Sequence, residues 1–349
     1  MTTKNDCNKS HSEEFSTEII EGLRGKGSIL IVTHDHPDPD ALAAAVALQH
    51  LILVKTGQKA TIAFGGVIGR RENLVMVNEL EIKSTSIDDL DLDTFNAVCM
   101  VDTQPGTGNN SYPVDRRVDL VIDHHLQKEH THSCRWVDVR PEYGASASIL
   151  FEYLQSQDVK IATKLATILF YAIKSETEDL GRDWTKSDRD AYLQLMPLCN
   201  NRILHEITHP KSSRLYFRYF ETGLKNAKIY GNALFFNLYM IDHPEIVAEI
   251  ADFLMRVEGI EIVLGLGCYH EEGVLSMRTS HQETHAGILM QKVVEGIGTG
   301  GGHSMTAGGQ VRPLPAANKS LGALEYELTG RLLAALGLEH TEPEILVAH

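Results

Sequence analysis

Short apolar runs alternate with helical stretches along the first half of the chain. Residues 28–33 (SILIVT) are rich in β-branched side chains, as is typical of a buried parallel strand. Similar runs predict strands at 60–64, 95–101 and 119–122, and alanine- and leucine-rich stretches predict helices at 41–54, 146–155 and 161–174. Because strands and helices alternate, the pattern predicts an α/β domain with an open, doubly wound, mostly parallel sheet and helices on both faces.

The pattern changes beyond residue 185. Up to residue 228 the chain is helical and connective, without a strong strand. Strands are then predicted at 233–241, 260–269 and 273–278, and helices at 245–257, 285–295 and the end of the chain. The expected organisation is a flexible N-terminal tail at 1–20, a first domain at 21–205, a helical linker at 206–228 and a smaller α/β domain at 229–349.

Composition narrows the classes of protein that fit this pattern. The formal net charge is −15, so the basic footprint of proteins that bind long nucleic acid is missing. No apolar run approaches the roughly 18 residues of a membrane span, and the polar N-terminus lacks a secretory signal. The five cysteines are scattered, at 7, 99, 134, 199 and 268, so a disulfide framework or zinc ribbon is not expected. These features predict a cytoplasmic protein with a small anionic ligand.

Acidic residues and histidines follow three of the predicted strands directly. The first strand runs into HDHPDPD, the third into an aspartate, and the fourth into DHH. The residues concerned are His34, Asp38, Asp40, Asp102, Asp123, His124 and His125. Since the carboxyl ends of parallel strands meet at one edge of a sheet, these side chains are expected to converge.

Imidazole and carboxylate together are ligands for a divalent ion such as Mn²⁺, Co²⁺ or Zn²⁺. The cluster has too many ligands for one ion, which favours a two-metal centre with a bridging carboxylate. An isolated aspartate after a strand is more often a turn or helix cap, and an isolated His-His pair is more often a surface feature. Three clusters at three strand ends are harder to explain in that way.

Four motifs in order resemble the DHH phosphoesterase superfamily. HDHPDPDA, VDTQ and IDHH resemble its first three motifs, and GTGGGHSMTAGGQV at 298–311 resembles the glycine-rich signature of the DHH-associated domain. The superfamily includes nanoRNase/pAp phosphatases, RecJ-type exonucleases and manganese pyrophosphatases. The resemblance implies a catalytic domain followed by a substrate-binding domain, with the active site in the cleft between them.

The resemblance also implies a role for each matching residue. Two Mn²⁺ ions are expected, with Co²⁺ or Mg²⁺ as alternatives. His34 and Asp38 would hold the first ion, Asp40 and His124 the second, and Asp102 would bridge them. Asp123 would orient His124, and His125 would face the substrate phosphate. The expected substrate contacts in the second domain are Arg278, Gly300, Gly301, Gly302 and His303.

The fourth motif departs from the family pattern. The family usually has an aspartate in a D-T pair there, whereas this chain reads IKSETEDLGR. Glu176 stands at the expected position and is favoured as the ligand that completes the second metal site. Asp179 lies close by and is the alternative.

The function implied is hydrolysis of very short RNA to mononucleotides. Dinucleotides such as pGpG or pApA, left by cyclic dinucleotide breakdown, and pAp are the expected substrates, and neither long nucleic acid nor a membrane is an expected partner. Hydrolysis of pyrophosphate or polyphosphate is one alternative, although the GGGH signature belongs by resemblance to the nucleotide-handling branch. A non-catalytic nucleotide-binding regulator is another. The sequence leaves the oligomeric state open, with a homodimer among the options.

Overall fold

The computed structural model describes residues 4–302, 305–312 and 318–347. The chain divides into two compact units, one ending at Pro210 and the other beginning at Lys211. Each unit has its own sheet and its own buried core. The expected cleft between the two domains stays a prediction.

A six-stranded, wholly parallel sheet forms the centre of the first unit. Its strands are β1 (Ile29–Val32), β2 (Ala60–Phe64), β3 (Thr85–Ser86), β4 (Ala97–Val101), β5 (Leu120–Asp123) and β6 (Trp136–Val139). They lie in the order β3-β2-β1-β4-β5-β6. Ile29 is therefore opposite both Ala60 and Ala97. The predicted parallel sheet is confirmed, and the strand order reverses between β1 and β4, where such sheets bind ligands.

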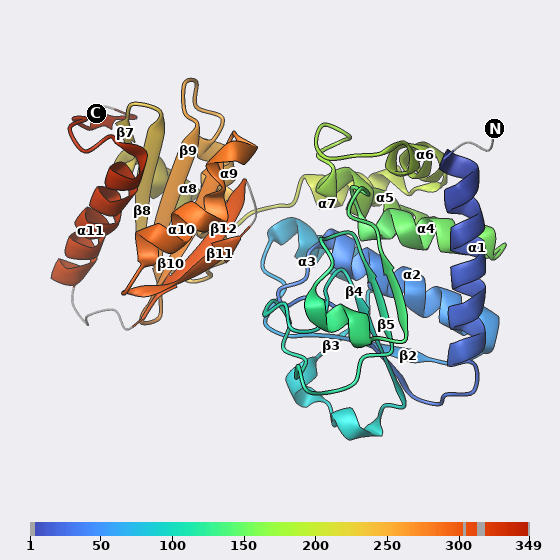
Figure 1. Ribbon diagram of the computed structural model, residues 1–349. Coiled ribbons are helices and arrows are strands. Elements are labelled where there is room, and N and C mark those ends of the chain that lie inside the picture. The colour runs from blue at the N-terminus through green and yellow to red at the C-terminus, as the bar shows by residue number, and fades with distance from the viewer. Residues whose placement is uncertain (1–3, 303–304, 313–317, 348–349) are drawn as a thin grey trace. The chain divides into compact units, whose positions relative to one another are not determined.

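The helices of the first unit share one large core with one face of this sheet (Figure 1). They are α1 (Lys4–Leu23), α2 (Pro39–Thr56), α3 (Arg71–Glu79), α4 (Ser146–Ser156), α5 (Thr163–Glu176), α6 (Lys186–Leu195) and α7 (Asn201–Thr208). Alternate strand residues such as Ile29 and Ile31 of β1 point into this core. Because strand side chains alternate between faces, Leu30 and Val32 point into a second, smaller cluster.

That second face corrects the expectation of helices on both sides of the sheet. Its cluster is completed by residues of the 3₁₀ turn η1 (Ile87–Asp89) and of loops, among them Tyr112 and Val118. Two further 3₁₀ turns, η2 (Leu92–Thr94) and η3 (Glu129–Ser133), occur between the strands on that half of the sheet. The connections from β3 to β4, from β4 to β5 and from β5 to β6 contain 3₁₀ turns and loops and no α-helix.

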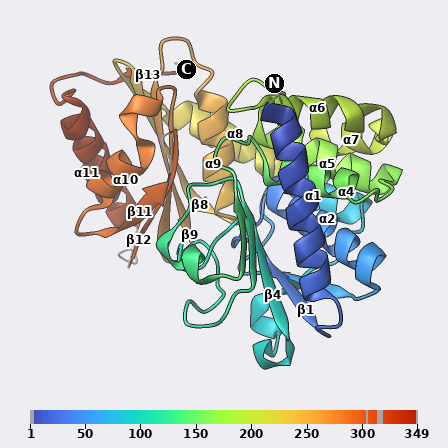
Figure 2. The same ribbon diagram turned by 45° about the vertical axis from the view of Figure 1, so that its right-hand side comes forward.

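The N-terminal segment also differs from the expected tail. Residues 4–23 form α1, which lies against α4 and α2 (Figures 1 and 2). Ile19, Ile20 and Leu23 are buried in the large core, and Glu18 accepts a hydrogen bond from the indole of Trp136 at 3.0 Å. The helix carries few apolar residues, and its polar composition hid their helical spacing.

The second unit has a seven-stranded mixed sheet. The strands are β7 (Lys228–Tyr230), β8 (Ala233–Ile241), β9 (Ile262–Tyr269), β10 (Glu272–Thr279), β11 (Gly298–Gly302), β12 (Thr306–Val311) and β13 (Glu344–Ile345). Their order is β11-β12-β10-β9-β8-β7-β13, and β8 and β9 are the parallel neighbours. The predicted second α/β domain is confirmed, with two glycine-rich strands that the apolar pattern did not reveal.

Helices cover both faces of this second sheet. They are α8 (Arg214–Asn226), α9 (Glu245–Leu254), α10 (Ala286–Val294) and α11 (Asn318–Leu336). One core contains α10 and α11, and the opposite core contains α8 and α9 (Figure 2). A short 3₁₀ turn, η5 (Gln282–Thr284), precedes α10, and another, η4 (Met196–Leu198), follows α6 in the first unit. Helix α8 was expected within a linker, but Tyr219 packs it into the second unit.

No helix in the described part of the chain is both long and apolar enough to cross a membrane. The cysteines whose side chains are described, Cys99, Cys134, Cys199 and Cys268, are free.

Candidate metal centre

The acidic residues and histidines after the strands of the first unit come together as the sheet topology predicts. His34 follows β1, Asp102 follows β4, and His124 follows β5. Asp38 caps the N-terminus of α2 and accepts a hydrogen bond from the backbone of Ala41 at 3.0 Å. The helix-cap interpretation of this aspartate is thus correct, and it holds alongside a place in the cluster.

Asp102 lies between two histidines. Its Oδ2 is 3.5 Å from His34 Nε2, and its Oδ1 is 3.5 Å from His124 Nε2. His34 Nε2 is also 3.7 Å from Asp38 Oδ2, and His124 Nε2 is 3.9 Å from Asp40 Oδ2. Two groups of donor atoms therefore meet at one carboxylate, which is the arrangement expected of a bridging ligand.

Asp102 is held in this place by burial and by an uncommon backbone conformation. Its side chain is 2% exposed, and Ser146 Oγ donates a hydrogen bond to Oδ1 at 3.0 Å. The residue has φ +56°, in the left-handed region that non-glycine residues seldom adopt. Strain of this kind often occurs at functional sites, where the surrounding structure enforces it.

Two imidazole rings are oriented with Nε2 directed at the carboxylates. His34 Nδ1 is 2.8 Å from the carbonyl of Asp35, and His124 Nδ1 is 3.1 Å from the carbonyl of Tyr143. A carbonyl can only accept a hydrogen bond, so Nδ1 carries the proton in each ring. The Nε2 lone pair is then available to a metal ion whenever the ring is neutral.

His125 has a different orientation, and Asp123 differs from its expected role. Asp123 Oδ1 accepts hydrogen bonds from His125 Nδ1 at 2.9 Å and from the backbone amide of His124 at 2.8 Å. Asp123 therefore orients the ring of His125, and the ring of His124 depends on Tyr143 instead. His125 Nδ1 is 3.7 Å from Asp102 and could join the cluster by distance. Its Nδ1 proton faces Asp123, and the expected contact with substrate stays a prediction.

Asp40 is fixed by the beginning of α4. Its Oδ2 accepts from the amide of Ser146 at 2.7 Å, and its Oδ1 accepts from the amide of Ala147 at 2.8 Å. Backbone amides in the first turn of a helix have no partner within the helix, so they commonly donate hydrogen bonds to a carboxylate. The side chain is 1% exposed, so its remaining lone pairs face the cluster and not bulk water.

The charge of the cluster suits a divalent cation. Burial alone would lower the pKa of His124, but the carboxylates of Asp102, Asp40 and Glu176 raise it to about 9. Burial, reinforced by Asp38 and Asp102, raises the pKa of Glu176 to about 7. Both shifts reflect several carboxylates placed close together, and a bound cation would relieve their repulsion. Nitrogen and oxygen donors without thiolate fit Mn²⁺ and related ions.

The structure distinguishes between the two acidic candidates of the fourth motif. Glu176 ends α5, and burial together with the nearby charges of Asp38 and Asp102 raises its pKa. Its Oε1 lies 3.8 Å from Arg182 Nη2. Asp179 is exposed, pairs with Lys174 and accepts a hydrogen bond from Tyr192 at 3.0 Å. Burial near the cluster favours Glu176 over the exposed Asp179, and its role as the fourth-motif ligand stays a prediction.

We expect Glu176→Gln to weaken Mn²⁺ binding by tenfold or more, on the order of 1.4 kcal/mol, because it removes a charge from the centre. Asp179→Asn is the matched control, since it removes an equal charge that Lys174 already compensates. Calorimetric titration of the metal-free protein with Mn²⁺ measures both. A larger loss in Asp179→Asn than in Glu176→Gln would show that the motif is aligned incorrectly.

The raised pKa values also predict how the stability of the metal-free protein depends on pH. His124 binds its proton more tightly when folded, so its contribution is complete below 6.5 and disappears as pH rises through about 9. The contribution of Glu176 to the stability of the folded state likewise disappears as pH rises through about 7. We expect the EDTA-treated protein to lose roughly 1–3 kcal/mol of stability between about pH 6 and pH 9. Denaturant unfolding measures this, and His124→Gln should reduce the slope; increasing stability over this window would contradict it.

Two residues missed by the sequence analysis support the centre. Asp35 Oδ1 accepts from the amides of Gly65 and Ser111 at 3.0 and 2.9 Å, which joins the loop after β1 to two others. Gln104 is fully buried and donates to Asp123 Oδ2 at 2.7 Å. Gln104 stands in the VDTQ motif, so its position next to Asp102 was the available signal.

In the second unit, the guanidinium of Arg278 is already engaged. It pairs with Asp252 and donates from Nη1 to Ser276 Oγ and to the carbonyl of Met277, both at 2.9 Å. Its side chain is 12% exposed. Contact with a substrate phosphate would require it to leave Asp252, so the expected role of Arg278 stays a prediction.

The glycine-rich signature at 298–311 contains β11 and β12, which pair antiparallel. A Cβ atom on Gly300 would lie 2.7 Å from Met290 of α10, and Gly302 has φ +156° with the carbonyl of Thr306 in the way. These two glycines therefore allow close packing within the unit, whereas a Cβ on Gly301 would meet open space. His303, the fifth expected contact, lies outside the described residues.

Comparison with known proteins agrees with this architecture. A model described as "DHH family, N-terminal domain" matches residues 28–173, and a model described as "DHHA1 domain" matches residues 233–328. The first match covers the parallel sheet with its cluster of ligands, and the second covers the mixed sheet with its glycine-rich strands.

Individual relatives extend the match to most of the chain. An uncharacterized protein of Methanocaldococcus jannaschii is 34% identical over 288 residues, which are 82% of this chain and 58% of that protein. An exopolyphosphatase-related protein from Bacteroides fragilis is similar in structure, with a TM-score of 0.74, 15% identity, and coverage of 93% of this chain and 98% of that one. RecJ from Thermus thermophilus in complex with Mn²⁺ has a TM-score of 0.51, 13% identity, and coverage of 93% and 55%. These two structures show the fold.

Proposed function

The chain belongs to the DHH family, and on that premise we propose that it is a two-metal phosphoesterase that hydrolyses very short RNA to mononucleotides. The observation that carries the proposal is the position of Asp102, whose two oxygens each lie 3.5 Å from a different histidine. A single buried carboxylate shared by two donor groups is what a pair of adjacent cations requires.

The proposed ions are two Mn²⁺. RecJ from Thermus thermophilus is known in complex with Mn²⁺, and the mixed imidazole and carboxylate donors here suit the same ion. His34 and Asp38 would hold one ion, Asp40, His124 and Glu176 the other, and Asp102 both. Such a pair, when bound, lowers the pKa of water and stabilises charge on a phosphoryl group.

His125 is the proposed contact to the scissile phosphate. Burial alone would lower its pKa, but the hydrogen bond to Asp123 raises it, which favours the imidazolium form. An imidazolium whose Nδ1 proton is held by Asp123 can donate from Nε2 to a phosphate oxygen. Its side chain is 37% exposed, enough for contact with a substrate.

The proposed substrates are dinucleotides such as pGpG or pApA, and pAp. The net charge of −15 supports a small anion over a polymer. Hydrolysis of pyrophosphate or polyphosphate is the second candidate, supported by the pairing of Arg278 with Asp252, which occupies the expected anchor for a nucleotide's terminal phosphate. An exopolyphosphatase-related protein also shares the fold.

A substrate panel with Mn²⁺ separates these candidates. It contains pAp, pApA, pGpG, a longer RNA, pyrophosphate, polyphosphate and a cyclic dinucleotide, with EDTA as the control. We expect mononucleotide release from the dinucleotides and pAp, and none with EDTA. Faster release of inorganic phosphate from pyrophosphate or polyphosphate would replace the proposed substrate. Nucleotide binding without any turnover would indicate a regulator.

A further inference from the structure

One short segment contacts three of the candidate metal ligands at once. Residues 143–147 comprise the end of the connection from β6 to α4 and the first two residues of α4. The carbonyl of Tyr143 accepts from His124, the amides of Ser146 and Ala147 donate to Asp40, and the Ser146 hydroxyl donates to Asp102. The position of this segment therefore determines how those three ligands are presented.

The side chain of Tyr143 anchors the beginning of the segment inside the protein. It is 3% exposed, and its hydroxyl donates to Glu152 Oε1 at 2.9 Å. The same oxygen accepts from Arg140 Nη1 at 3.2 Å and lies 3.2 Å from Ser187 Oγ. One hydroxyl thus joins α4, α6 and the residue that follows β6.

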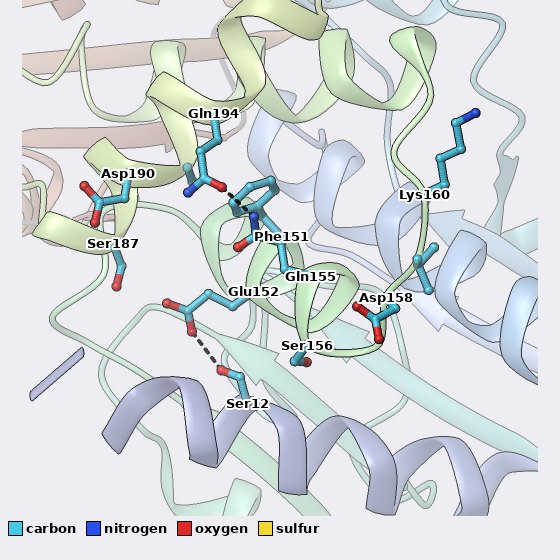
Figure 3. A pocket seen from close by; sticks show the side chains of 12 residues that line it. Ser12, Phe151, Glu152, Gln155, Ser156, Asp158, Lys160, Ser187, Asp190 and Gln194 are labelled. Carbon is cyan, nitrogen blue, oxygen red and sulfur yellow. Dashed lines mark hydrogen bonds between the residues drawn. The ribbon is translucent and has the colours of Figure 1, made fainter. Parts of the chain in front are cut away.

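The partners of Tyr143 belong to a larger buried network. Arg140 donates to Asp138 from Nε at 2.9 Å and to Glu152 from Nη1 at 2.8 Å. Ser12 of α1 donates to Glu152 Oε2 at 2.7 Å, as Figure 3 shows. Ser12, Glu152 and Ser187 also line a hollow of about 710 Å³ next to α4 and α6. The anchor is therefore built from several elements, α1 included.

A second anchor holds the next residue. The amide of Gly144 donates to Asp188 Oδ2 at 2.9 Å, and Asp188 also accepts from the amide of Thr185 at 2.8 Å. A Cβ atom on Gly144 would lie 2.5 Å from the carbonyl of Asp183, so the segment packs directly on the loop that follows Glu176.

We propose that Tyr143 is a positioning residue, whose buried hydroxyl fixes the segment that orients His124 and Asp40 toward the second metal ion. The inference rests on the proposed function, since that function gives the ligands their roles. The positioning role accounts for the buried polar network around Tyr143. Burying polar groups costs free energy, and each of them needs a hydrogen-bond partner. His34 and Asp38 make none of the segment's contacts described above, so the first metal ion, linked to the segment through the shared Asp102, should depend on Tyr143 less than the second.

The test compares Tyr143→Phe with Tyr153→Phe in the full chain. Tyr153 is a fully buried tyrosine of the same network, but its hydroxyl donates to Asp138 and does not contact residues 143–147. Metal-free protein is titrated with Mn²⁺ by calorimetry and with Co²⁺ by visible absorption, and thermal unfolding is recorded for each variant. We expect both variants to lose stability, but only Tyr143→Phe to weaken one of two binding events by tenfold or more and to change the Co²⁺ spectrum. Glu152→Gln, which weakens the same anchor, should reproduce that change in part.

The outcomes separate the inference from the proposed function. If Tyr143→Phe and Tyr153→Phe bind Mn²⁺ and Co²⁺ alike, Tyr143 does not position the ligands and the inference is wrong, whatever the enzyme hydrolyses. If the wild-type protein binds two ions but hydrolyses no phosphate ester, the proposed function is wrong while the metal titrations still test Tyr143. If the wild-type protein binds no ion, both are wrong.

Discussion

Asp102→Asn is expected to abolish phosphate-ester hydrolysis while the chain stays folded. Both oxygens of Asp102 face histidines at 3.5 Å, so an amide there would remove the shared charge and present an N–H to one of the rings. We expect turnover to fall by a thousandfold or more, about 4 kcal/mol in the barrier. Asparagine is the better replacement than alanine, since it tolerates the left-handed backbone of this residue, at φ +56°.

Asp119→Asn is the matched control for this variant. Asp119 is another buried aspartate of the same sheet, 4% exposed, but it accepts from the amide of Val98 and pairs with Arg117, outside the ligand cluster. Steady-state kinetics and thermal unfolding of both variants give the answer. Near-normal turnover in Asp102→Asn would refute the two-metal proposal, and equal losses in both variants would point to general destabilisation.

Turnover is expected to fall steeply as RNA lengthens beyond about five nucleotides, a length taken from the family resemblance. The net charge of −15 leaves little attraction for a long phosphate backbone, whose binding depends on neutralising phosphates. The rate should decrease tenfold or more between a two-mer and a twenty-mer. Kinetics on a ladder of 5′-phosphorylated RNAs measure this. Equal rates along the ladder would indicate a processive exonuclease.

The same ladder tests the anchor expected of Arg278. If Arg278 binds the terminal phosphate, Arg278→Ala should raise KM for two-mers, and Asp252→Asn should lower it by releasing the guanidinium from its pair. The two variants should then change KM for short RNA in opposite directions. No change in either would leave Asp252 as the permanent partner of Arg278, and the anchor would have to be sought elsewhere.

Much of the candidate centre could be predicted because the topology of the parallel strands determines where most of its residues lie. Once β1, β4 and β5 are recognised as parallel strands, their carboxyl ends meet, and His34, Asp102 and His124 come together with them. The distances between side chains could not be predicted, because they depend on α2 and α4 starting where they do. Asp40, for example, is fixed by backbone amides that no sequence motif displays.

The errors have equally specific causes. Helix α1 was expected to be a flexible tail because its polar residues outnumber the few, such as Ile19 and Ile20, that enter the core. Strands β11 and β12 were missed because glycine carries no apolar side chain to reveal a strand, although Gly300 is required there by the proximity of Met290. The role of Asp123 was misassigned because sequence alone does not show which of two adjacent imidazoles a carboxylate will reach.

The strand order of the first unit also bears on how the protein folds. Ile29 of β1 pairs with Ala97 of β4, although the chain between them forms β2 and β3 on the other side of β1. This pairing therefore joins distant parts of the sequence. Such non-local parallel pairing is slow to form compared with helices and hairpins. His34 and Asp102 lie just beyond those two strands, so their approach to 3.5 Å requires that late pairing to be complete. A nascent or partly folded chain would therefore have no assembled site for a cation, and metal uptake would report on the completion of the sheet.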